Sequence, residues 1–255
     1  MAFLLFLLSA IWADAALERV GLAVDTVDYI VSEFSTNEVI AESWSDPQSA
    51  SPGSLLKPFV ALAYGRKQGL IFPVVECTGE TCWLPTGHGR VGIERALSHS
   101  CNTYFRLLSQ NVSAEEVGFE SSRLGLQAPP PNSPTNALWG LLADWVSTPQ
   151  EILRAFSELT RRRNEFESAV VLQGLREAAR SGTASALSSR LPQDAFAKTG
   201  TAVCAHPTRA DGDGFAVAVY PADSPRYVIT VRIHNQTGRV AAGAAAVILE
   251  ALTGR

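Results

Sequence analysis

The sequence predicts an α+β domain with three layers, α/β/α, around a central antiparallel sheet of about five strands. Segments with strand patterns lie near both ends of the 255-residue chain, and segments with helical spacing lie between them. We therefore expect one domain from residue 16 to 255. Its sheet subdomain would cover about 20–68 and about 190–255, and an inserted all-helical subdomain would cover about 70–188.

The first twenty residues, MAFLLFLLSAIWADAALERV, contain an apolar run that is too short to span a bilayer. The small residues at Ala13 and Ala15 predict a signal peptide, residues 1–15, that is cleaved after Ala15. Its first residues include no lysine or arginine, so a misassigned start codon and a buried N-terminal helix are alternatives. A signal peptide implies an exported, periplasmic or extracytoplasmic protein with no membrane span in the mature chain.

A β-hairpin is the first predicted part of the sheet. The segment DYIVSEFSTNEVIAES alternates on both sides of a Ser-Thr-Asn turn, which predicts strands at 29–34 and 39–43. The helical region has a break around Ser100. Its segment STPQEILRAFSELTRRR predicts a helix that begins at a capping serine or threonine, and we call it the TPQ helix. The chain then returns to strands in DAFAKTGTA, GFAVAVYP and RYVITVRIHN, and it ends in a helix of small residues, GRVAAGAAAVILEALTG.

The helix after the hairpin carries an informative lysine. Pro58 is tolerated only in a first helical turn, so Ser54 lies at or next to the helix N-terminus and Lys57 lies one turn later on the same face. The chain has 21 Lys plus Arg, but only Lys57, Lys67 and Lys198 are lysines. A position that must lose its proton requires lysine, because a guanidinium stays charged.

Charge and cysteine content limit the possible partners. The net charge of −4 and the lack of a basic stripe argue against a nucleic-acid partner. Cys77 and Cys82 are close enough in sequence for a short disulfide, and buried free thiols are an equal alternative. Cys101 and Cys204 are the other two of the four cysteines. The four cysteines include no Cys-x-x-Cys pair, and no paired histidines lie nearby, so we expect no zinc site.

Three short motifs occur in order along the chain: Ser54-Leu55-Leu56-Lys57, Ser100-Cys101-Asn102 and Lys198-Thr199-Gly200. The third is the most informative, since about 0.01 such matches are expected by chance where lysine is so rare. The set resembles the serine β-lactamase and penicillin-binding protein superfamily, most closely a penicillin-binding protein transpeptidase domain. The segments PTGHGRVGIERALSHSCNTYF and FAKTGTA are also similar to that family, and the resemblance covers nearly all of the predicted mature chain.

The resemblance implies an enzyme that transfers acyl groups through a covalent serine intermediate. Ser54 would be the nucleophile, Lys57 the base, and Ser100 a proton relay. The backbone N–H groups of Ser54 and Thr201 would form the oxyanion hole. The implied substrate-binding residues are Asn102 for the substrate amide, Thr199 and Thr201 for the terminal carboxylate, Lys198 for positive potential, and Gly200 within the same motif.

The implied substrate is a peptidoglycan stem peptide that ends in D-Ala-D-Ala, with β-lactams as inhibitors that acylate Ser54 and with no metal or organic cofactor. Transpeptidase, carboxypeptidase and endopeptidase action all stay open, because ALWGLLADW replaces the Gly-rich turn that the family has before its TPQ helix. His88 has no implied catalytic role. We expect the side chain of Cys101 to point away from those of Ser100 and Asn102.

Two alternatives to this function are a serine β-lactamase and a non-catalytic β-lactam or peptidoglycan sensor or binding module. A β-lactamase needs a group that activates a deacylating water, and no glutamate with that context can be placed. A binding module needs no nucleophile, whereas this chain keeps the motif serine and both motif lysines.

Overall fold

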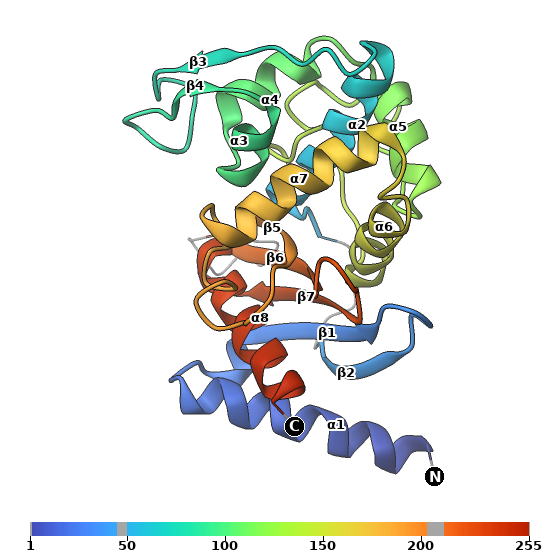
Figure 1. Ribbon diagram of the computed structural model, residues 1–255, viewed down its shortest axis with the longest axis vertical. Helices are drawn as coiled ribbons and strands as arrows, with labels where there is room; N and C mark the ends of the chain where they lie inside the picture. Colours follow the sequence, from blue (N-terminus) through green and yellow to red (C-terminus); the bar gives the residue numbers. More distant parts are fainter. Residues whose placement is uncertain (1, 45–49, 203–211, 255) are drawn as a thin grey trace.

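The computed structural model describes residues 2–44, 50–202 and 212–254, with side chains from residue 10 onward, so that Cys204 and His206 lie outside the described residues. Five strands form one antiparallel sheet in the order β2-β1-β7-β6-β5 (Figure 1). A separate two-stranded ribbon pairs β3 with β4. The bounds are β1 (Val27–Glu33), β2 (Val39–Ser43), β3 (Val75–Cys77), β4 (Gly89–Val91), β5 (Phe196–Ala202), β6 (Asp213–Tyr220) and β7 (Tyr227–Ile233).

The sheet is built from both ends of the chain, which confirms the predicted α+β class. Tyr29 of β1 pairs with Ser43 of β2 and with Val231 of β7, so the N-terminal hairpin extends the C-terminal strands. Every residue of β6 is buried, because helices cover the sheet on both faces and leave no solvent side for polar residues.

Helices pack against both faces of the sheet. α8 packs on β6 and β7 and against α1, while α6 packs on the opposite face of β6 and β7 and α7 packs on β5 (Figure 1). Many of the buried residues of α8 are alanines, which let its backbone approach the sheet closely. The helices are α1 (Ala2–Arg19), α2 (Lys57–Lys67), α3 (Ile93–Ser98), α4 (Asn102–Ser109), α5 (Ala114–Arg123), α6 (Pro149–Arg161), α7 (Phe166–Arg180) and α8 (Gly238–Thr253), with short 3-10 turns η1 (Val24–Thr26) and η2 (Gly53–Leu56).

Local sequence signals set the ends of several helices. Thr148 caps α6 and forms a reciprocal capping box with Glu151, as the TPQ pattern predicted. The predicted break around Ser100 separates α3 from α4. The helix expected from Ser54 is divided, because η2 holds Ser54 and α2 begins only at Lys57. The helical insertion also contains the short β3–β4 ribbon, which the sequence pattern had not indicated.

The N-terminal segment forms a helix that packs on the rest of the domain. α1 runs through the expected cleavage position, and its Ala13 and Leu17 are fully buried. The Tyr29 hydroxyl donates a hydrogen bond to Asp14 Oδ1 at 2.8 Å. This packing favours the buried-helix alternative, and cleavage after Ala15 stays a prediction. No helix in the described part of the chain is long and apolar enough to cross a bilayer.

Candidate active site

Two fully buried lysines from distant elements meet at one hydroxyl. Lys57 begins α2, and Lys198 lies in β5. Lys57 Nζ donates to Ser100 Oγ at 3.1 Å, and Lys198 Nζ donates to the same oxygen at 2.9 Å. Lys57 Nζ also donates to Asn102 Oδ1 at 2.7 Å. These four residues, which we call the lysine cluster, bring all three sequence motifs together.

Burial and apolar neighbours set the charge state of the lysine cluster. The Lys57 ammonium lies 5.4 Å from the ring centres of both Phe105 and Trp139, which exclude water from it. Burial lowers the pKa of Lys57 to about 7. Burial, and then the charge of Lys57, lower the pKa of Lys198 well below its usual value. Within the described residues neither lysine forms an ion pair with a carboxylate.

Ser100 has an unusual backbone conformation. Its φ of 53° lies in the left-handed region, which few residues other than glycine adopt and which stores strain of about 1 kcal/mol or more. Its carbonyl oxygen accepts hydrogen bonds from Lys57 Nζ at 2.7 Å and from Trp83 Nε1 at 3.2 Å. The conformation directs the Ser100 hydroxyl between the two lysines.

Ser54 lines a cavity of about 330 Å³ beside the lysine cluster. Its hydroxyl makes no hydrogen bond to Lys57 within the part of the chain that the structure describes, although the two residues are three positions apart. η2 lies directly against β5: a Cβ atom at Gly200 would lie 2.4 Å from the Pro52 carbonyl oxygen and 3.3 Å from the Ser54 nitrogen. Glycine at position 200 therefore lets the backbone of Ser54 approach that of β5.

The remaining predicted residues of β5 lie at the same cavity. Thr199, Gly200 and Thr201 all line it, together with Ser100 and Asn102. The Thr199 hydroxyl donates to Thr183 Oγ1 at 2.6 Å, and Thr201 Oγ1 accepts from the Gly238 backbone N–H, at the start of α8, at 3.1 Å. The structure thus brings together all of the residues that the motifs singled out.

Several cavity residues were not predicted from the sequence. They are Trp83, Trp139, Gly140, Leu141, Thr183, Thr237, Gly238 and Arg239. Arg239 lies over the Trp83 ring with 5.6 Å between the guanidinium carbon and the ring centre, although the two are far apart in sequence. The segment ALWGLLADW contains Trp139, Gly140 and Leu141. Its departure from the family pattern was the sequence feature that could have pointed to these cavity residues.

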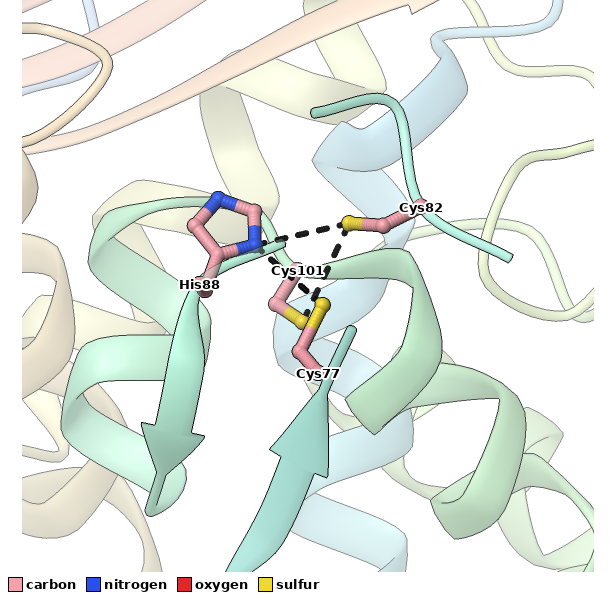
Figure 2. Close-up of side chains that lie close together, drawn as sticks. All are labelled: Cys77, Cys82, His88 and Cys101. Atoms are coloured by element: carbon pink, nitrogen blue, oxygen red, sulfur yellow. Dashed lines mark hydrogen bonds between the residues drawn. The ribbon is translucent and has the colours of Figure 1, made fainter. Parts of the chain in front are cut away.

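A second polar cluster lies on the other side of the Ser100–Asn102 turn. Cys77, Cys82, His88 and Cys101, which we call the sulfur cluster, each offer one ligand atom, and these atoms lie within 4.8 Å of one another (Figure 2). Cys77, Cys82 and Cys101 are free thiols, so the Cys77–Cys82 disulfide is not formed. The Cys101 sulfur lies 4.0 Å from the Cys82 sulfur. We expected no zinc site because the sequence has no Cys-x-x-Cys pair and no paired histidines. That reasoning did not take into account three separated cysteines with His88 as a fourth ligand.

Comparisons with known proteins agree with this geometry. The sequence model of the Penicillin binding protein transpeptidase domain family matches residues 33–253. No curated protein matches the chain. Penicillin-binding protein 2 of Pseudomonas aeruginosa is similar in structure with a TM-score of 0.76 and 17% identity, over 95% of this chain and 73% of that chain.

Two further solved structures share the fold. The transpeptidase domain of Burkholderia pseudomallei penicillin-binding protein 3 has a TM-score of 0.75 and 17% identity, over 96% of this chain and 92% of that chain. Penicillin-binding protein 2 of Helicobacter pylori, solved in complex with MreC, has a TM-score of 0.77 and 16% identity, over 96% of this chain and 62% of that chain. The family match over residues 33–253, together with this shared fold, shows that the chain belongs to the penicillin-binding protein transpeptidase domain family.

Proposed function

We propose that this chain is a serine-type DD-transpeptidase or DD-carboxypeptidase that acts on the D-Ala-D-Ala ends of peptidoglycan stem peptides and is acylated by β-lactams. One observation carries the proposal: the Ser100 hydroxyl accepts hydrogen bonds from two buried lysines, at 3.1 Å and 2.9 Å, beside a cavity that Ser54 lines. A buried amine with a pKa of about 7 is a suitable base near neutral pH.

In the first step the Ser54 oxygen attacks the carbonyl carbon of the penultimate D-Ala, and the Ser54 proton moves to neutral Lys57. The carbonyl oxygen becomes an anion that the backbone N–H groups of Ser54 and Thr201 stabilise. The close approach of η2 to Gly200 supports this pairing of two N–H groups from different elements. Collapse of the intermediate breaks the C–N bond, and the leaving D-Ala nitrogen takes the proton from Lys57 through Ser100.

In the second step an amine or water attacks the acyl-enzyme carbonyl and loses its proton to Lys57. The new amide or acid forms as the bond to Ser54 breaks, and the Ser54 oxygen takes the proton from Lys57, which is then neutral again. Before the first step Asn102 positions the substrate amide, while Thr199 and Thr201 bind the terminal carboxylate, which later leaves with D-Ala. Binding of that carboxylate next to the KTG segment would raise the pKa of Lys198, because an adjacent anion favours the protonated amine.

The test is time-resolved labelling of the purified protein with a fluorescent penicillin, followed by intact mass, with wild type beside Ser54→Ala. We expect a stable adduct in wild type and none in Ser54→Ala. An adduct that clears within seconds would identify a β-lactamase instead. No adduct on folded wild-type protein would mean that the cavity only binds its ligand and would refute the enzymatic proposal.

A second assay identifies the acyl acceptor. The enzyme is incubated with a stem peptide ending in D-Ala-D-Ala, with and without an added amine, and the products are weighed by mass spectrometry. Loss of D-Ala alone indicates carboxypeptidase action, and a cross-linked product indicates transpeptidation. As an enzyme of the cell wall it would act outside the cytoplasm, so we also propose that the chain is exported.

A further inference from the structure

We propose that the sulfur cluster is a structural zinc site that fixes the Ser100–Asn102 turn from behind. Three of its four ligands come from β3 and the loop that leads to β4, and the fourth comes from the start of α4. Cys77 ends β3, Cys82 lies in the following loop, His88 immediately precedes β4, and Cys101 is the N-cap of α4. Figure 2 shows the three sulfur atoms and the His88 ring converging on one point.

The distances agree with a tetrahedral ion. With zinc about 2.3 Å from sulfur and about 2.0 Å from nitrogen, tetrahedral angles place two sulfurs about 3.8 Å apart and a sulfur and a nitrogen about 3.5 Å apart. His88 Nδ1 lies 3.4 Å from Cys82 Sγ and 3.6 Å from Cys77 Sγ. The sulfurs of Cys82 and Cys101 are 4.0 Å apart, far beyond the roughly 2.05 Å of a disulfide bond.

The chemistry and burial of the ligands favour zinc in a structural role. Three thiolates and one imidazole in a tetrahedral arrangement select zinc over the hard cations magnesium and calcium. Cys77, His88 and Cys101 are buried, whereas Cys82 is half-buried and provides a route by which an ion enters. Because four protein ligands fill the coordination sphere, no position is left for a substrate. Binding displaces the thiol protons.

The backbone holds these ligands in place. The loop between β3 and β4 reverses tightly at Gly87, whose φ is +72° and where a Cβ atom would lie 2.1 Å from the Cys77 carbonyl oxygen. The Cys82 N–H donates to the Gly79 carbonyl at 3.1 Å, which turns Cys82 back toward Cys77. The Thr103 hydroxyl lies 3.3 Å from Cys77 Sγ and is close enough to hydrogen-bond a coordinated sulfur.

The site is directly connected to the lysine cluster. Cys101 lies between Ser100 and Asn102, so a metal–sulfur bond at Cys101 would restrict both neighbours. Trp83, next to Cys82, donates hydrogen bonds to the carbonyls of His99 and Ser100 at 3.1 and 3.2 Å. A left-handed residue persists only where its surroundings hold it, and zinc would supply that restraint for Ser100. This second part of the inference rests on the proposed function.

The first experiment measures zinc alone. Full-length protein is purified under reducing conditions, dialysed, and analysed for metal content, and apo-protein is titrated with zinc against a chromophoric chelator. We expect one zinc per chain and a dissociation constant below about 10 nM. We expect Cys82→Ser to weaken binding at least about a hundredfold relative to wild type.

Cobalt substitution of the wild-type protein avoids any dependence on how the variants fold. Tetrahedral cobalt gives intense visible bands, and thiolate ligands add charge-transfer absorption in the near ultraviolet. Both features are expected at one equivalent. Apo-protein with all thiols reduced that binds neither zinc nor cobalt would overturn the inference, as would equal zinc affinity in Cys82→Ser and wild type.

The link to acylation is tested separately. Removing zinc is expected to lower the rate of penicillin labelling about tenfold and to lower the melting temperature, with both restored by added zinc. If zinc binds but labelling is unchanged after its removal, the metal site stands and the link to Ser100 is wrong. If zinc binds and wild type is never labelled, the proposed function fails while the metal site stands.

Discussion

The lysine cluster and the sulfur cluster both include residues of the Ser100–Asn102 turn, and they differ in how well their polar atoms are hydrogen-bonded. Each buried ammonium donates at least two hydrogen bonds of 3.1 Å or less, so the lysine cluster is satisfied by protein atoms alone. The side-chain contacts of the sulfur cluster among the described residues are 3.3–4.0 Å long and involve weak sulfur donors and acceptors. The lysine cluster therefore has its hydrogen bonds within the protein, whereas the sulfur cluster offers four convergent ligand atoms to the proposed zinc.

The largest expected effect comes from a single substitution that changes the lysine cluster and leaves the sulfur cluster intact. Lys57→Met keeps the volume of the side chain and removes the amine, so penicillin labelling should slow by about 10²- to 10⁴-fold while zinc content stays the same. Lys67→Met is the control, since Lys67 forms an exposed ion pair with Glu116 at 3.0 Å, and its labelling rate should match wild type. Labelling of Lys57→Met at the full rate would contradict the base assignment.

A pH profile of labelling tests the same cluster without mutation. The base acts when neutral, and burial lowers the pKa of Lys57 to about 7, so the rate should rise with pH and level off above about 8. At pH 5 it should be about a hundredth of the plateau. Bound zinc and circular dichroism are recorded at each pH. Labelling rates are compared only between pH values at which both are constant. A rate that does not change between pH 5 and 8 would exclude Lys57 as the base.

Gly200→Ala tests the contact between η2 and β5. The added methyl would lie 2.4 Å from the Pro52 carbonyl oxygen, so we expect about 1–3 kcal/mol lower stability and about tenfold slower labelling. Gly243→Ala in α8 is the matched control, because no atom lies within 4 Å of its added methyl, and it should stabilise the protein by about 0.5–1 kcal/mol. Denaturant unfolding measures both. Equal stability of the two variants would mean that η2 is not held against the strand.

The smallest expected effect concerns the connection between the clusters. Trp83→Phe keeps an aromatic ring and removes the N–H that reaches the carbonyls of His99 and Ser100. Loss of about 0.5–1.5 kcal/mol of hydrogen bonding should slow labelling about two- to tenfold without changing zinc content. A loss of zinc in this variant would show that Trp83 supports the metal ligands rather than the turn.

The fold was largely predictable because its signals are local. Alternation in the hairpin, the cap at Thr148 and the small residues of α8 each specify an element within a few residues of sequence. The lysine cluster was also predictable, because lysine is rare and two of the three lysines lie in short motifs.

The sulfur cluster and much of the cavity wall could not be predicted in this way. Strands of three residues, such as β3 and β4, are too short to show a pattern, yet their pairing of Cys77 with Gly89 brings His88 to the sulfurs. Trp83 and Arg239 meet only after the whole domain has folded. Contacts between distant segments with no shared motif leave no signal in a single sequence.

The packing of α1 on α8 has a practical consequence for how the molecule can be held. α1 lies at one end of the structure against the last residues of α8, and it also packs on β2, the edge strand farthest from β5 (Figure 1). Four strand spacings, about 19 Å, therefore separate the two edges of the sheet. A tether at the N-terminal end should leave the cavity facing solution. Protein immobilised in this way should bind ligand with the same rate constants as protein free in solution, as measured by surface-based detection.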